Sequence, residues 1–164
     1  MKKLFLFLFL TICCLSCTVE DETVDITVMP EATTTGAETF GCLVDGWLYV
    51  GGRYSTVDWR EDYDDTPSIN FTYSEKRNEM NVSARVKADI WIRYTIQAPK
   101  AGQEVSYINA LFNEEELEDG KVFITRFDTK KKIISGTFGG GSMSNGRFDV
   151  HYKINKYEEA PKQE

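Results

Sequence analysis

The stretch Met80–Gln97, which reads MNVSARVKADIWIRYTIQ, decides the fold class of this chain. In each half of it, every second residue is apolar. The apolar sets are Met80, Val82, Ala84 and Val86 in the first half, and Ile90, Ile92, Tyr94 and Ile96 in the second. Successive side chains of a strand point to opposite faces of a sheet, so this alternation predicts two strands, each with one buried face.

The same pattern recurs along most of the chain and predicts nine strands. Their expected positions are Thr39–Val44, Trp47–Val50, Ser68–Tyr73, Met80–Val86, Asp89–Gln97, Val105–Phe112, Lys121–Asp128, Ile133–Phe138 and Phe148–Ile154. Asp45-Gly46 favours a tight hairpin turn. Gly139–Gly146 (GGGSMSNG) is expected to be a hairpin loop. No segment of ten or more residues has a convincing helical period, and Asn113–Asp119 is the one stretch compatible with a single helical turn.

Nine short strands with hairpin spacing predict an all-β fold, which we expect to be an antiparallel, calycin-like barrel of about eight or nine strands. A β-sandwich is the alternative, since the alternation does not say whether the sheet closes. The domain is expected over residues 39–157, after a flexible tether over 17–38 that is rich in Thr and acids. Residues 158–164 are expected to form a disordered tail.

The N-terminus has the features of an export signal. Lys2 and Lys3 precede an apolar run, Leu4–Ile12, that is too short to span a bilayer but has the length of a signal-peptide core. Leu15-Ser16-Cys17 resembles the bacterial lipobox, in which the cysteine is acylated and becomes the first mature residue. We therefore expect residues 1–16 to be a lipoprotein signal peptide. The alternative is an ordinary secretory signal cut nearby.

This interpretation places the protein at the outer membrane, anchored by acyl chains on Cys17 and facing the periplasm or the cell surface. Loss of Lys2 and Lys3 with the signal changes the net charge from −7 to −9. Such a balance disfavours nucleic acid and anionic lipid surfaces as partners, because both repel it. The acids Glu20–Glu22 fit either a surface-export tag or a solvated linker.

The cysteine pattern excludes a disulfide framework and a zinc site. Only Cys42 lies inside the expected domain, where it shares parity with the apolar Phe40 and Val44. We expect it to be a buried, apolar side chain. A tetrahedral zinc site needs four ligands from separated pairs. Apart from the clustered N-terminal cysteines, the chain offers only Cys42 and one histidine, His151, which do not supply such pairs.

Two blocks resemble a family of Bacteroidota lipoproteins. PEATTTGAETFGCLVDG (Pro30–Gly46) is similar to that family's opening TGAxTFGCLV(N/D)G block. VFITRFDTKKKIISGTF (Val122–Phe138) and GRFDVHY (Gly146–Tyr152) are similar to its closing strands. The resemblance implies origin and location, and it carries over no catalytic residue because the family has no established activity.

Aromatic and charged side chains supply the candidate ligand site. Trp91 and Arg93 fall on the polar face of their strand and offer a stacking platform for a sugar or another flat ligand. Three further aromatics of the expected loop 51–67 extend this candidate site, namely Trp59, Tyr54 and Tyr63. The alternative is that this loop folds over the strand and covers Trp91.

Other constellations are weaker candidates. Asp62, Asp64 and Asp65 offer oxygens for calcium, but the EF-hand spacing is absent and solvated charge is the ordinary explanation. His151, Asp149 and a serine such as Ser135 form a conceivable nucleophile–base–acid set, although no serine has a GxSxG context. No cofactor is expected.

These observations predict a lipid-anchored envelope domain that binds a small ligand or a glycan without covalent chemistry. The alternative is a structural subunit that docks to another envelope protein through a sheet edge or acidic loops. A hydrolase comes third.

Overall fold

The computed structural model describes residues 27–51, 69–87 and 90–155. These residues form eleven strands and no helix. The strands are β1 (Thr39–Val44), β2 (Trp47–Gly51), β3 (Ile69–Ser74), β4 (Glu79–Lys87), β5 (Ile90–Gln97), β6 (Gln103–Phe112), β7 (Glu115–Glu116), β8 (Gly120–Asp128), β9 (Ile133–Gly140), β10 (Met143–His151) and β11 (Lys153–Ile154). Within the described part of the chain, no helix is long and apolar enough to cross a membrane.

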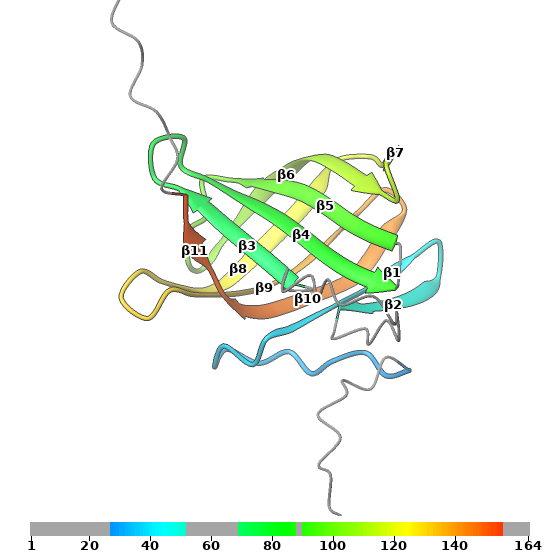
Figure 1. The fold of residues 1–164 in the computed structure, drawn as a ribbon, viewed down its shortest axis with the longest axis horizontal. Coiled ribbons are helices and arrows are strands. Elements are labelled where there is room, and N and C mark those ends of the chain that lie inside the picture. The colour runs from blue at the N-terminus through cyan, green and yellow to red at the C-terminus, as the bar shows by residue number, and fades with distance from the viewer. Residues whose placement is uncertain (1–26, 52–68, 88–89, 156–164) are drawn as a thin grey trace, which may run out of the picture.

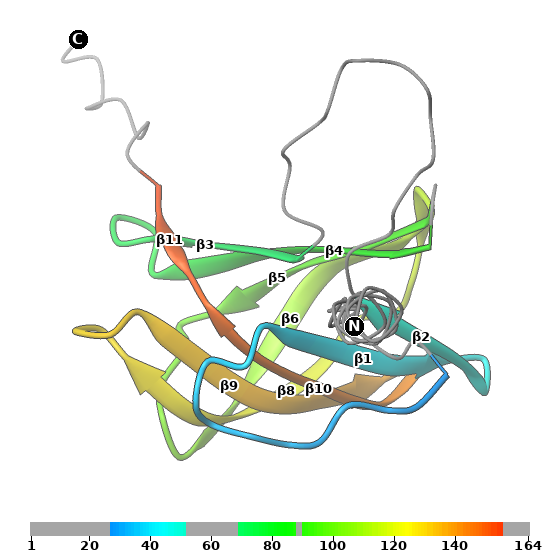
Figure 2. The same ribbon diagram turned by 60° about the horizontal axis from the view of Figure 1, so that its bottom comes forward.

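All strands belong to one strongly curled sheet, so the expected barrel-like, antiparallel fold is confirmed (Figure 1). The strand order is β11-β3-β4-β5-β6-β8-β9-β10-β1-β2, with β7 paired to β6. Every pairing is antiparallel except that of β11 with β3. The chain passes from β10 through Tyr152 into β11, which rises from the layer of β10 to the layer of β3 (Figure 2). The pairing of β11 with β3 thus links the last strands of the chain to the edge strand β3 within one curled sheet, whereas a sandwich would keep two separate sheets.

The core lies inside the curled sheet and is built from the alternating positions. Strand β4 alternates strictly between buried and half-buried residues, and β5 does so from Ile92 onward. The buried side chains include Phe40, Cys42, Phe71, Met80, Ile92, Ile96, Tyr107, Ile124, Ile134 and Phe148. Burial of this apolar surface is the main stabilising contribution to the fold.

Two glycines make room for aromatic rings of the core. A Cβ on Gly146 would lie 2.5 Å from the ring of Phe138, which sits opposite it on β9. A Cβ on Gly136 would lie 3.0 Å from the Phe148 ring and 2.6 Å from a carbonyl oxygen of β8. The glycines therefore let rings from one strand pack flat against the backbone of its neighbour.

The expected helical turn over Asn113–Asp119 is wrong. Residues 115 and 116 pair with the end of β6 as the short strand β7. Asn113 and Glu114 have φ values of 51° and 68°, in the left-handed region that a right-handed helix does not use. The expected loop Gly139–Gly146 is also mostly strand. Only residues 141 and 142 separate β9 from β10.

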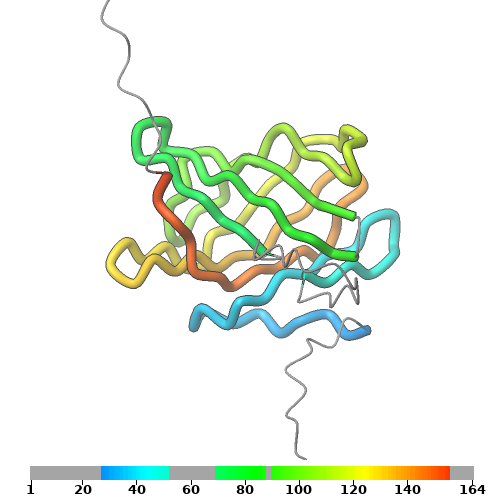
Figure 3. The backbone as a smooth tube through the Cα atoms, in the orientation of Figure 1, coloured from blue at the N-terminus to red at the C-terminus, as the bar shows by residue number. Residues whose placement is uncertain are grey.

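Residues 27–38, here called the N-terminal segment, lie along the outside of β9, β10 and β1 (Figure 3). Pro30 accepts a 3.1 Å hydrogen bond from Arg147, and the Pro30 ring covers Gly41. Glu38 accepts a 3.0 Å bond from the backbone of His151. This segment was expected to belong to a flexible tether, yet its described part makes specific contacts. Most of these contacts are hydrogen bonds to residues of β10. The lack of aromatic residues in this segment therefore gave no sign of them.

Candidate functional site

The interior of the barrel is filled with side chains and offers no ligand site in the described residues. Phe138 contacts four other rings at centroid distances of 5.3 to 6.4 Å, those of Phe40, Tyr94, Tyr107 and Phe148. Cys42 is buried as expected, and burial raises the pKa of its thiol to about 12. A thiol with that pKa stays neutral and inert. The two grooves described below both lie on the outer surface of the described strands.

The outer surface of β3 to β6 carries a regular array of polar side chains, here called the polar face. In-register pairing sets them in three rows across the strands. The rows are Thr72–Asn81–Thr95, Asn70–Ser83–Arg93 and Arg85–Trp91. Thr95 donates a 3.1 Å hydrogen bond to Asn81, which ties β5 to β4 on this surface. Alternation forces this arrangement, because the apolar partners of these residues point inward.

A groove of about 300 Å³ runs through the polar face. Its polar lining is formed by Asn70, Thr72, Asn81, Ser83, Arg93, Thr95 and Asn109. Six of these side chains are neutral amides or hydroxyls, each of which both donates and accepts hydrogen bonds. A ligand that presents many hydroxyl groups matches such a lining.

Trp91 lies beside this groove between two guanidinium groups. The Arg93 guanidinium is 5.7 Å from the centre of the indole ring, and the Arg85 guanidinium is 5.9 Å from it. Both distances are in the range of a cation–π contact. Arg93 also forms an ion pair with Glu114, which follows β6. The expected pairing of Trp91 with Arg93 on one surface is therefore present in the fold.

The other predicted site residues lie outside the described part of the chain. Trp59, Tyr54 and Tyr63 belong to residues 52–68, and so do the candidate calcium ligands Asp62, Asp64 and Asp65. Cys17 lies before residue 27. Among the residues that the structure describes, no group of three or more His, Cys, Asp or Glu is placed to hold a metal ion.

Asp149 organises a buried polar cluster on the outer surface of β10. The carboxylate is fully buried. It accepts hydrogen bonds from the hydroxyls of Ser135 (2.6 Å), Thr33 (2.6 Å) and Thr35 (3.4 Å), and from the backbone N–H groups of Thr35 (2.8 Å), Gly36 (2.8 Å) and Ala37 (3.1 Å). Burial by itself raises the pKa of Asp149, but these bonds outweigh it and hold the pKa well below its usual range.

This cluster is structural, and the conceivable catalytic set does not form in it. Ser135 is fully buried, and its hydroxyl donates directly to Asp149. The ring of His151 contacts Glu38 instead, with 2.6 Å between Nδ1 and a carboxylate oxygen. A nucleophilic serine needs a base on its own oxygen and access for a substrate. At Ser135 the only group that accepts from the hydroxyl in the described residues is the Asp149 carboxylate, whose lowered pKa makes it a weak base, and burial of Ser135 denies a substrate access.

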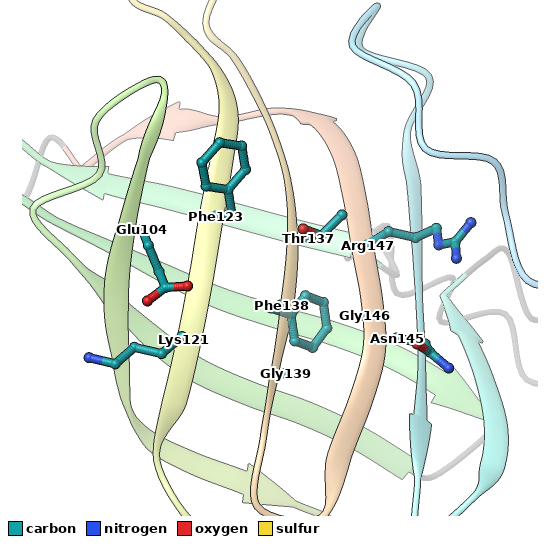
Figure 4. A pocket seen from close by; sticks show the side chains of 9 residues that line it. All are labelled: Glu104, Lys121, Phe123, Thr137, Phe138, Gly139, Asn145, Gly146 and Arg147. Carbon is teal, nitrogen blue, oxygen red and sulfur yellow. The ribbon is translucent and has the colours of Figure 1, made fainter.

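A second groove, of about 400 Å³, crosses the outer surface of β6, β8, β9 and β10 (Figure 4). Glu104, Phe123, Thr137 and Arg147 are in register across these four strands. Phe123 is 44% exposed, an unusual fraction for a large apolar side chain on this surface. Figure 4 shows Arg147 pointing away from the groove.

Trp91 and Arg93 were predictable from the alternation of their strand, whereas the amides and hydroxyls beside them were not identified as part of a site. Their signal was present in the alternation, as the polar half of Ile69–Tyr73 and Met80–Val86. It was interpreted only as solvent exposure, because strand alternation does not show which polar residues share a groove. Comparison with family models, curated proteins and solved structures gives no match to this chain.

Proposed function

We propose that this protein is a lipid-anchored, cell-envelope binding domain that takes a glycan on its polar face without covalent chemistry. The observation that carries the proposal is the groove of neutral amides and hydroxyls next to Trp91. Sugar hydroxyls pair with such groups, and the apolar face of a sugar ring stacks on an indole. The filled interior supports the outer surface as the place of binding.

The anchoring part of the proposal rests on the lipobox-like Leu15-Ser16-Cys17. Acylation of Cys17 would hold the domain at the outer membrane, facing the periplasm or the cell surface. The intact mass of the mature protein, purified from membranes, tests it. A mass without acyl chains on Cys17 would contradict it.

Glycan binding is tested with a glycan panel, using thermal shift and then calorimetry. A ligand at a concentration of about 100 Kd stabilises the folded state by about 2.7 kcal/mol, which a thermal shift detects. Trp91→Ala and Asn81→Ala are expected to remove the shift. Trp47→Ala is the matched control, because Trp47 is 74% exposed and lies on β2, outside the polar face and its groove. Absence of any stabilising glycan, or equal loss in the control, contradicts the proposal.

The second candidate function is docking to another envelope protein, favoured by the exposed Phe123 in the second groove. Aromatic side chains are enriched where protein interfaces form. A tagged chain should then retain a stoichiometric partner from solubilised membranes, and Phe123→Ser should lose it while Trp91→Ala keeps it.

A further inference from the structure

The charges of the described turns are separated between the two ends of the barrel. At one end lie the turns 75–78, 98–102 and 129–132, here called the basic rim. Their side chains include six cations and one acid: Lys76, Arg77, Lys100, Lys130, Lys131 and Lys132, with Glu75. Glu79 and Asp128 flank these turns, and Arg77 pairs with Glu79 at 3.4 Å, so the rim keeps an excess of cations that lies mostly on Lys130–Lys132. At the other end lie the turns 45–46, 113–119 and 141–142, here called the acidic rim. They contain six acids and no cation: Asp45, Glu114, Glu115, Glu116, Glu118 and Asp119.

The three turns of the basic rim belong to one continuous end of the molecule (Figure 1). The backbone N–H of Ala98 donates a 2.8 Å bond to the carbonyl of Asn78, which joins the first two turns. The rings of Tyr73, Phe127 and Tyr152 meet between β3, β8 and β10 at centroid distances of 5.3 to 5.9 Å. These rings fill this end of the barrel, so the basic rim is a broad surface and not the mouth of a cavity.

The lysines of the third turn project from a fixed backbone. Asp128 accepts hydrogen bonds from the backbone N–H groups of Lys130 (3.0 Å) and Lys131 (2.9 Å), and it pairs with Arg126 at 2.7 Å. The backbone bond from Lys131 and the Arg126 side chain lower the pKa of Asp128 to about 2. The side chains of Lys130, Lys131 and Lys132 are exposed. The backbone of this turn is therefore already ordered, so binding through its three lysines would cost little backbone conformational entropy.

We propose that the basic rim docks onto the surface of an anionic phospholipid bilayer. The negative net charge of the whole chain would oppose docking to an anionic bilayer only if the distant acidic residues also repelled that bilayer. They do not, because salt screens the electrostatic interaction of each charge over a distance of about 8 to 10 Å at physiological ionic strength. A strand of ten residues such as β6 spans roughly 33 Å, so the acidic rim lies beyond that range. Each lysine near an anionic membrane contributes about 1 kcal/mol.

A flat bilayer fits this rim better than a compact anion does. The cations are spread over three turns around three packed rings, and none of them converges on a groove. Lysines on exposed turns suit the headgroup region, where the charge stays in water and the carbon stem is shielded.

The expected anchor also keeps the rim within reach of the bilayer. Nine residues lie between Cys17 and Thr27, which is the first described residue, so ten Cα–Cα steps join the two. Ten steps extend to about 35 Å at most, roughly the length of the barrel. Acyl chains and a basic surface together make a firm two-part attachment. This inference goes beyond glycan binding, uses a different surface and stands without it.

The experiment uses the chain from residue 18 onward, which retains every described residue and carries no acyl chain. Co-sedimentation compares vesicles of phosphatidylethanolamine with and without phosphatidylglycerol. Binding is expected only with phosphatidylglycerol and should fall steeply as salt is added.

Matched double variants separate the rim from the net charge. Lys130→Gln/Lys131→Gln and Lys87→Gln/Lys121→Gln remove the same charge, but Lys87 and Lys121 lie on strands away from the basic rim. The first is expected to weaken binding about thirtyfold, because each of its two lysines contributes about 1 kcal/mol. The second is expected to change binding by less than about twofold, since its cations are screened from the bilayer. All four side chains are exposed, and melting temperatures check that both variants fold.

Three outcomes would overturn the proposal. One is equal loss of binding in the two double variants, and another is no preference for vesicles that contain phosphatidylglycerol. The third is binding of a soluble polyanion such as dextran sulfate without binding to the vesicles, which would assign the rim to a polymeric partner. Loss of glycan binding in Trp91→Ala bears on none of these, so the two proposals fail independently.

Discussion

The basic rim and the acidic rim are the two ends of one sheet, yet they differ in construction as well as in charge. The basic rim is packed by the rings of Tyr73, Phe127 and Tyr152, and the Asp149 cluster lies near it. At the acidic rim, Asp45 donates to the carbonyl of Ser142, and Trp47 stands 74% exposed. In a run of antiparallel hairpins, every second turn lies at the same end. The basic turns therefore lie together at one end of the barrel, and the acidic turns lie together at the other end.

The largest expected effect on stability comes from Asp149, whose hydrogen bonds join the N-terminal segment to β9 and β10 near the basic rim. Asp149→Asn replaces one carboxylate oxygen with an amide donor that faces other donors, including those of Thr33 and Ala37. Leaving such groups unpaired is expected to lower the free energy of unfolding by about 3 kcal/mol.

Urea denaturation measures this loss. Asp45→Asn at the acidic rim is the control and should change stability by less than about 0.5 kcal/mol. Similar losses of stability in the two variants would show that the hydrogen bonds of Asp149 contribute no more to stability than the Asp45 carboxylate does.

The aromatic residues of the two rims provide the second prediction. Phe127→Ala opens the packed end of the barrel and is expected to cost about 2 kcal/mol, less than a fully buried ring would. Trp47→Ala removes an exposed ring and is expected to cost less than about 0.5 kcal/mol. Thermal unfolding measures both values. A larger loss for Trp47→Ala would mean that the acidic rim is the packed one.

The third prediction concerns acid. Folding lowers the pKa of Asp149 and Asp128, so both carboxylates bind protons more weakly in the folded state. Their stabilising contribution is complete above the unfolded pKa near 4 and is lost as the pH falls below it. Unfolding followed from pH 7 down to pH 2 should show this loss below about pH 4. Asp149→Asn should flatten it, and an unchanged acid slope would contradict the role of the cluster.

The smallest expected effect is at the acidic rim. Glu114→Gln/Glu115→Gln/Glu116→Gln makes the net charge more positive by three without adding a cation to the basic rim. Binding to vesicles that contain phosphatidylglycerol should change by less than about twofold, because the acids lie beyond the screening length. A strong increase would show that net charge, and not the basic rim, controls binding.

Much of the fold was predictable from local sequence. The alternation in Met80–Gln97 placed β4 and β5 to within one residue at each end. The expected first strand coincides with β1. The failures were at Asn113–Asp119 and Gly139–Gly146, where charge and glycine content suggested a helical turn and a loop. Cross-strand pairing with β6 and β9 decided those segments instead.

The candidate sites were less predictable, because each depends on residues that are far apart in the sequence. Trp91 and Arg93 were visible as neighbours on one strand face. Arg85 reaches the same indole only through the pairing of β4 with β5. The partners of Asp149 in the N-terminal segment are 112 to 116 residues away from it. Alternation patterns relate only neighbouring residues, so they did not predict contacts between residues this far apart in the sequence.

The sequence by itself determined the strands, the inward and outward side of each, and the burial of Cys42, because period-two alternation is local. Only the tertiary structure decided that the sheet curls through β11 onto β3, which polar residues share a groove, and which turns share an end. A net charge of −7 is a sum over the whole chain. The fold places a net charge of +5 on the turns of the basic rim and −6 on the turns of the acidic rim, and screening makes each rim act alone.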